Sequence, residues 1–214
     1  ALIHVDRVVF GGAAVDRSAE AVVVADLNGD GRADVATLTR PAYEAGPGRV
    51  SIRLADETGR WTTAPAHEFE TLADATNLIA ADFTGDGSLD LIAASQEGFE
   101  LRAGHGDGSF GEVSGRWSRD GSMMVAADFD GDGRMDLATA GTYEISLLLG
   151  NGSGSFSEGP VIAESASRIA VRDMDSNGAA EIAVLRNWGD ASVVLYAEVG
   201  TSPVSPPAGQ QDRG

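Results

Sequence analysis

One nine-residue pattern of oxygen-bearing side chains and glycine occurs four times in this chain, and it constrains the fold more than any other feature. The four copies are Asp26–Asp34, Asp82–Asp90, Asp128–Asp136 and Asp173–Glu181. Each copy has an oxygen side chain at positions 1, 3, 5 and 9 and a glycine at position 6. Alternate residues of a tight loop can point inward together, and Ca²⁺ prefers six to eight oxygen ligands. The pattern therefore predicts four calcium-binding loops.

The predicted ligands are the four side chains of each loop together with the backbone carbonyl at position 7. They are Asp26, Asn28, Asp30, Arg32 and Asp34; Asp82, Thr84, Asp86, Ser88 and Asp90; Asp128, Asp130, Asp132, Arg134 and Asp136; and Asp173, Asp175, Asn177, Ala179 and Glu181. The glycine at position 6 is expected to have a positive φ. With four aspartates, the third loop should bind most tightly. The fourth should bind most weakly, because it has Asn177 at position 5, Glu181 at position 9 and no glycine at position 4.

The loop begins like an EF-hand loop but ends differently. No glutamate stands at position 12, and an apolar segment follows the acid at position 9 in every copy. The loop is therefore expected to connect two strands rather than two helices. Asp-Gly runs also occur in ordinary turns, but four copies in register favour the metal interpretation.

The loops start 56, 46 and 45 residues apart, a period typical of propeller or solenoid arrays. Short apolar or alternating runs bounded by Gly, Asp and Asn predict three strands per unit, here called A, B and C. Strand A is expected at Ala21–Ala25, Asn77–Ala81, Met123–Ala127 and Arg168–Arg172. Strand B is expected at Val35–Thr39, Leu91–Ser95, Leu137–Ala140 and Ile182–Arg186, and strand C at Val50–Leu54, Glu100–Ala103, Ile145–Leu149 and Ser192–Tyr196.

A glycine-rich turn that ends in an aromatic residue follows strand C. The aromatic is Phe110 or Phe156 in the second and third units and Trp61 in a degraded version of the first, and the fourth unit has none. The segment Leu2–Val15, with Phe10, resembles the missing tail of a repeat. It is therefore predicted to be a fourth strand, D, that completes the last unit and removes exposed sheet edges. A partial ring completed by another chain, or an open stack, is an alternative.

These loops and turns resemble the FG-GAP/VCBS repeat family, which also forms the propeller head of integrin α chains. The resemblance spans Ala21–Gly200 and rests on the metal loop with its following strand and on the turn at Leu147–Phe156. It implies an all-β fold, a β-propeller of four-stranded antiparallel blades with calcium in each A–B loop. We expect one domain over residues 1–200, with repeats of about 21–72, 73–118, 119–164 and 165–200 and an N-terminal strand at 2–15. Residues 201–214 are expected to form a Pro/Gly-rich tail.

The formal net charge of −18 disfavours nucleic acid and anionic membranes as partners. The loops hold 13 of the 33 acidic residues, and four Ca²⁺ ions would cancel eight negative charges. No cysteine is present, which excludes disulfides and thiol chemistry, and no apolar run is long enough to insert in a membrane. Calcium loops suit an extracellular or cell-surface location. The first residue is Ala1 rather than Met, as expected of a processed protein or an excised domain.

The connections between strands B and C carry an aromatic residue beside an acid, on the face opposite the metal loops. These candidate ligand-binding residues are Tyr43 and Glu44, Phe99 and Glu100, Tyr143 and Glu144, and Trp188 and Asp190. Aromatic faces stack on sugars and carboxylates accept hydrogen bonds from hydroxyls, but such aromatics also cap cores.

The sequence favours a secreted recognition or adhesion module for a glycan or an extracellular protein. One alternative is a calcium-stabilised subunit that self-assembles into a surface layer or filament. Another is an accessory domain of a secreted enzyme. No nucleophile elbow is present, so the chain is not expected to be an enzyme.

Overall fold

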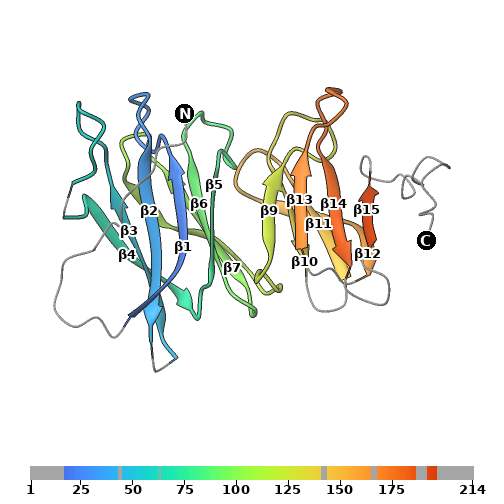
Figure 1. Cartoon of the computed structure of the whole chain (residues 1–214), viewed down its shortest axis with the longest axis horizontal. Coiled ribbons are helices and arrows are strands. Elements are labelled where there is room, and N and C mark those ends of the chain that lie inside the picture. Colours follow the sequence, from blue (N-terminus) through green and yellow to red (C-terminus); the bar gives the residue numbers. More distant parts are fainter. Residues whose placement is uncertain are drawn as a thin grey trace, which may run out of the picture.

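A computed structural model describes residues 17–42, 45–62, 64–140, 144–164, 168–186 and 192–196. Within these ranges the chain forms antiparallel β-sheets and no helix (Figure 1). In particular, none of the described residues belongs to a helix long and apolar enough to cross a membrane. The all-β prediction is confirmed.

The sheets follow the chain, one after another. The first contains β1 (Arg17–Ala25), β2 (Asp34–Pro41), β3 (Pro47–Arg53) and β4 (His67–Ala73). The second contains β5 (Asn77–Ala81), β6 (Asp90–Ala94), β7 (Phe99–Gly104) and β8 (Phe110–Trp117). The third contains β9 (Met124–Ala127), β10 (Asp136–Ala140), β11 (Glu144–Gly150) and β12 (Phe156–Glu164). The fourth contains β13 (Arg168–Arg172), β14 (Glu181–Arg186) and β15 (Ser192–Tyr196).

Each sheet has its strands in sequence order, so every unit is an antiparallel meander like the predicted blade. The predicted strands A, B and C overlap observed strands in all four units. The turn after strand C leads into a fourth strand in the first three units, where β4, β8 and β12 follow the predicted aromatic turn or its degraded version.

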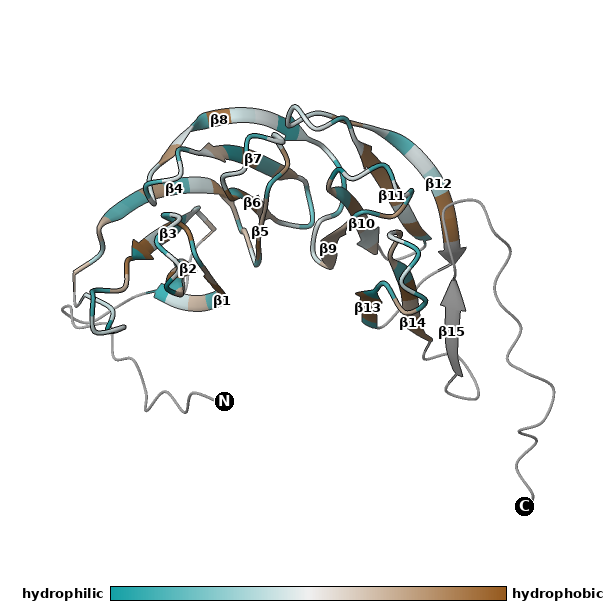
Figure 2. Ribbon diagram, turned by 90° about the horizontal axis from the view of Figure 1, so that it is seen from above, coloured by the Kyte–Doolittle hydropathy of each residue, from teal (hydrophilic) through white to brown (hydrophobic). Residues whose placement is uncertain are grey.

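The four sheets stand side by side along an arc (Figure 2). Strands β1, β5, β9 and β13 lie on its inner side, and β4, β8 and β12 lie on its outer side. The first and fourth sheets are at its two ends. The described residues thus form an open arc of blade-like sheets, and ring closure is not confirmed. The predicted closing strand at 2–15 and the tail at 201–214 lie outside the described residues.

The core consists of three clusters, one between each pair of neighbouring sheets. Side chains alternate across a strand, so each sheet has one face toward the preceding sheet and one toward the following sheet. In the first interface, Ala36 and Leu38 of β2 pack with Leu91 and Ala93 of β6. Ile92 of β6, one position from both Leu91 and Ala93, belongs instead to the second interface. Burial on both faces explains why β6 is continuously apolar from Leu91 to Ala94 instead of alternating.

Candidate metal loops and the opposite face

The backbone of the loops agrees with the predicted turn. The glycines at position 6 have φ values of 81°, 89°, 83° and 98°, which are left-handed conformations that favour glycine. Position 4 is also left-handed, with φ of 74°, 71° and 75° at Gly29, Gly85 and Gly131. In the fourth loop Ser176 takes this position with φ of 63°, so the backbone is strained there.

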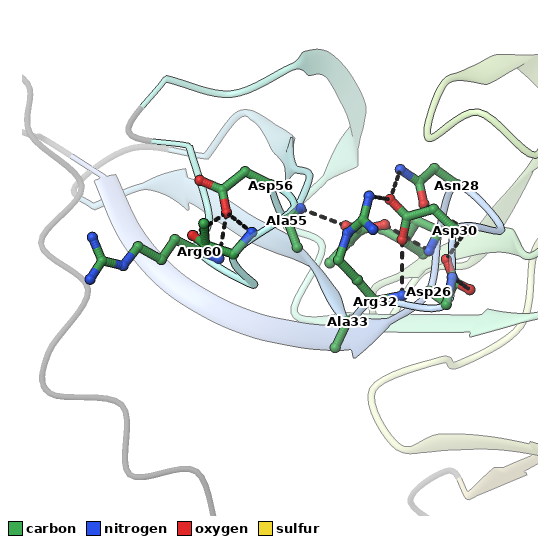
Figure 3. Close-up of polar contacts among 12 residues, drawn as sticks. Asp26, Asn28, Asp30, Arg32, Ala33, Ala55, Asp56 and Arg60 are labelled. Carbon is green, nitrogen blue, oxygen red and sulfur yellow. Dashed lines mark hydrogen bonds and ion pairs between the residues drawn. The ribbon is translucent and has the colours of Figure 1, made fainter.

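The carboxylate at position 1 holds the loop closed from inside. Asp26 accepts hydrogen bonds from the backbone N–H groups of Asp30 at 3.0 Å and of Gly31 at 2.7 Å (Figure 3). Asp128 likewise accepts from Gly131 at 2.7 Å and from Gly133 at 2.8 Å. These bonds direct backbone N–H groups at the carboxylate and fix its orientation.

The acid at position 9 fastens the loop to the sheet. Asp34, Asp90 and Asp136 are fully buried. In Asp136, Oδ2 accepts from Phe129 N at 2.8 Å and Oδ1 accepts from Gly150 N, at the end of β11, at 2.7 Å. Asp34 makes the same two bonds, to Leu27 N at 3.0 Å and to Ala55 N at 2.7 Å. The sequence predicted a ligand at this position but not its structural role.

Two loops bring three acids together. Carboxylate oxygens of Asp128, Asp130 and Asp136 lie within 4.8 Å of one another, and those of Asp173, Asp175 and Glu181 do the same. Two ligands that each lie about 2.4 Å from one ion are at most about 5 Å apart. The all-oxygen donor set and this spacing fit calcium. In the first and second loops, position 3 is Asn28 or Thr84, so fewer carboxylates converge.

The acid at position 5 does not join these clusters. Asp132 Oδ2 forms an ion pair with Arg134 Nη1 at 2.6 Å, and Asp30 Oδ2 forms one with Arg32 Nη2 at 2.6 Å. The guanidinium two residues later is close enough to neutralise this carboxylate. For a cation to receive position 5 as predicted, this side chain must turn from the arginine toward the loop centre.

Burial also affects the ionisation of two acids at position 9. It raises the pKa of Asp90 and of Asp136, although backbone hydrogen bonds oppose the shift. The neighbouring carboxylates of Asp130 and Asp128 raise the pKa of Asp136 further. A divalent cation among these groups would favour their charged forms.

The predicted ligand-binding residues lie in different environments. Phe99 is 1% exposed and stacks on Trp117 at 4.8 Å between ring centroids. Glu100 is also 1% exposed and forms an ion pair with Arg116 Nη2 at 3.0 Å. This pair therefore offers no surface to a large ligand. Glu144 is exposed and accepts a hydrogen bond from Ser146 Oγ at 2.9 Å.

The remaining predicted ligand-binding residues, Tyr43, Glu44, Tyr143, Trp188 and Asp190, lie outside the described residues. Their ligand-binding role stays a prediction.

A polar groove of about 280 Å³ lies at the end of the sheets opposite the metal loops. It is lined by Arg40, Ala73, Asp74, Thr76, Ser95, Gln96, Glu97 and Ser122. Asp74 has φ of 53°, and its Oδ1 lies 4.0 Å from Arg40 Nη1. Sequence reasoning missed the groove because its residues come from three repeats. The only local signal was the cluster of small and polar residues at the ends of the strands.

Residues 18–52 match the FG-GAP repeat, and residues 42–93, 82–139 and 128–184 match the FG-GAP-like repeat. The chain belongs to the FG-GAP repeat family. The overlapping matches run through the metal loops of all four units.

Solved structures with a related fold include a lectin from Agrocybe aegerita described as specifically recognising non-reducing terminal N-acetylglucosamine. The FG-GAP chain shares 19% identity with it at a TM-score of 0.50, over 86% of this chain and 67% of the lectin chain. The chain also has a weaker similarity to the Tc holotoxin pore of Photorhabdus luminescens, at 15% identity and a TM-score of 0.45, over 80% of this chain and 11% of the toxin chain. No curated protein sequence matches the chain.

Proposed function

We propose that this FG-GAP repeat protein is an extracellular recognition module that binds a glycan or protein ligand and is stabilised by up to four Ca²⁺ ions. The observation that carries the proposal is the repeated loop, whose third and fourth copies bring acids at positions 1, 3 and 9 within the span of a Ca²⁺ coordination sphere. The loops and a potential ligand surface are at opposite ends of the sheets, so metal and ligand need not compete.

The calcium would act on the fold. The loop acids would bind the ion. The ion would supply positive charge where buried carboxylates repel one another. Because position 9 of each loop is also bonded to the end of strand C in the first three sheets, metal there would hold loop and sheet together. Calcium is abundant outside cells, which fits the proposed location.

The polar groove is the described surface that best suits a ligand rich in hydroxyl groups. Arg40 and Gln96 offer hydrogen-bond donors, and Asp74 and Glu97 offer acceptors, within one groove of about 280 Å³. The lectin with a related fold recognises a sugar, which supports a glycan as the first class to test. We propose a role in binding rather than in catalysis.

The test is a glycan array probed in millimolar calcium, with an EGTA control. We expect binding to a defined set of sugars that is lost in EGTA and is reduced at least tenfold by Gln96→Ala combined with Glu97→Ala. The control is Glu112→Ala on β8, whose side chain is fully exposed and lies outside the groove. Binding that survives the groove variant would move the ligand to another surface, and a blank array would favour a protein ligand.

A further inference from the structure

Most of the exposed large apolar side chains of the described residues lie at the two ends of the arc. Val22 and Val24 of β1 are 63% and 58% exposed, and Met174 in the fourth loop is 51% exposed. The fourth such residue, Val161, is 60% exposed on the edge strand β12. Because the unit repeats, Val22, Val24 and Met174 have counterparts in the other sheets.

Aligned on the loops, Val22 corresponds to Leu78, Met124 and Ile169, and Val24 corresponds to Ala80, Ala126 and Val171. All six counterparts pack into the cluster shared with the preceding sheet. The first sheet therefore presents, toward solvent, the face that the other three sheets bury against a neighbour.

The groove on this open face has further interface residues. It has a volume of about 460 Å³ and includes Val35, Arg53 and Trp61 in its lining. Trp61 corresponds to Phe110 and Phe156, which both pack against the preceding interface cluster.

A polar residue of this groove, Arg53, also has a counterpart that contacts the preceding sheet. Arg53 corresponds to Arg102, which reaches the preceding sheet by donating from Nη2 to Glu70 O at 3.0 Å and by lying 4.7 Å from the centroid of Phe69. The open face thus repeats both the apolar and the polar positions of an internal interface.

The turn after strand C shows the same difference. A Cβ placed on Gly108 would meet Leu54 of the preceding sheet at 2.6 Å, and one on Gly154 would meet Leu101 at 3.0 Å. The corresponding Gly59 has the same left-handed conformation, with φ of 75°, but a Cβ there would meet nothing within 4 Å. The space that a preceding sheet fills elsewhere is open in front of Gly59.

At the other end of the arc, the fourth sheet exposes a residue whose counterparts pack against a following sheet. Met174 stands at loop position 2, where Leu27, Phe83 and Phe129 are at most 2% exposed and pack in the interface with the following sheet. Phe83, for example, meets Phe156 of the following sheet edge-on at 5.7 Å between ring centroids. By this correspondence, Met174 would face the residue equivalent to Phe156 in a following sheet, and in the first sheet that residue is Trp61.

We propose that the open face of the first sheet docks on the far face of the fourth sheet of a second copy of this chain. Met174 of one copy would then pack on Trp61 of the other, a favourable sulfur–aromatic contact. The occupant is a second copy because the first and fourth sheets of one chain lie at opposite ends of the arc (Figure 2). The arc turns both ends to the same side, so two copies related by a two-fold axis close a ring through two identical head-to-tail contacts. This inference concerns assembly and does not depend on the proposed ligand.

Mass in solution gives the first test. In millimolar calcium, light scattering should show twice the chain mass of 22.0 kDa, and Val22→Arg combined with Val24→Arg should reduce it to one chain mass. Val161→Arg is the matched control, because this valine is equally exposed but outside both faces, and it should leave the mass unchanged. A wild-type monomer at all concentrations, or a ladder of larger particles, would overturn the two-copy ring.

Cross-linking identifies which faces meet. The chain has no cysteine, so each introduced thiol is unique. A Val24→Cys chain mixed with an Ala170→Cys chain should form a disulfide between the two variants, because Ala170 corresponds to Val23 on the face toward the following sheet. A disulfide only between two Val24→Cys chains would show head-to-head docking and overturn the proposal. A disulfide within one chain that carries both substitutions would overturn it in favour of a ring closed by one copy.

Discussion

The third and fourth loops share a fold but differ at positions 4, 5 and 9, which should affect how strongly each loop binds a metal ion. The third has aspartates at positions 1, 3, 5 and 9, and glycine at position 4 with φ of 75°. The fourth has Asn177 and Glu181 in place of two of these aspartates and holds Ser176 at φ of 63°. Both nevertheless bring three acids within 4.8 Å. The sheet framework therefore positions the acids in both loops, and we expect backbone strain and charge to decide how tightly each loop binds calcium.

Calcium removal should have the largest effect. An ion that binds only the folded state stabilises it by about 2.7 kcal/mol per site when calcium is at 100 times its Kd. EGTA should therefore lower the melting temperature by roughly 10 °C or more if several sites are filled, since 1 kcal/mol shifts a chain of this size by about 2–4 °C. Calorimetry with and without EGTA measures this. An unchanged melt would show that the loops do not use calcium to support the fold.

Among single substitutions, replacement of the buried acid at position 9 should lower the free energy of unfolding most. Asp136→Ala leaves the N–H groups of Phe129 and Gly150 without their acceptor, and each unsatisfied buried donor costs about 1–3 kcal/mol. We expect a loss of roughly 2–4 kcal/mol in the free energy of unfolding, measured by urea denaturation in EGTA so that metal does not contribute.

The matched change in the fourth loop is Glu181→Ala, which removes the acceptor of Met174 N. It should destabilise less, because the described contacts of Glu181 include one backbone donor, whereas those of Asp136 include two. Equal losses would mean that the two loops are tied to their sheets equally well.

Substitutions at position 5 should weaken calcium binding to the third loop more than to the fourth. A unit charge about 4 Å from a divalent ion contributes about 2 kcal/mol even in water, or more than tenfold in affinity. Asp132→Ala should therefore weaken calcium binding to the third loop by at least tenfold. Asn177→Ala, which removes a neutral ligand, should have a smaller effect on the fourth. Titration calorimetry compares the two, and an Asn177 effect as large as that of Asp132 would contradict the charge argument.

Substitutions at position 4 should have the smallest effect on stability. Ser176→Gly relieves a left-handed backbone and should stabilise the protein by up to about 1 kcal/mol. Gly131→Ser places the same strain in the third loop and should destabilise it by a similar amount. Melting temperatures of the two variants should move in opposite directions by a few degrees. Movement in the same direction would show that side-chain contacts, and not φ, decide this position.

Local periodic features could be predicted from the sequence. The positive φ at Gly31, Gly87, Gly133 and Gly178 follows from loop chemistry, and the strands follow from apolar runs bounded by turn residues. The meander within each sheet follows from short connections. These features depend on residues close to one another in the chain, so the order of residue types is enough to predict them.

Features that depend on packing between repeats could not be predicted. Phe99 was a candidate surface aromatic, but it points into the interface with the third sheet and stacks on Trp117. The groove unites Arg40 of the first sheet with Ser122, which lies beside the third. Ring closure was predicted from a strand-like segment outside the described residues, and the described sheets form an open arc. Side-chain direction and long-range juxtaposition require the curvature of the array, which no local pattern contains.

The alternation of side chains gives the array a direction. Every sheet has one face that receives the preceding unit and a different face that meets the next, and in three units the position 9 acid connects its loop to the sheet of the same unit. A unit of about 45 residues therefore contains the bonds of its own sheet and loop. Its two faces join it to its neighbours by core packing and by hydrogen bonds such as Gly154 N to Phe83 O at 2.9 Å. Gene duplication or loss of whole units would lengthen or shorten such a protein without rebuilding any interface, provided that the cut falls between strand D of one unit and strand A of the next.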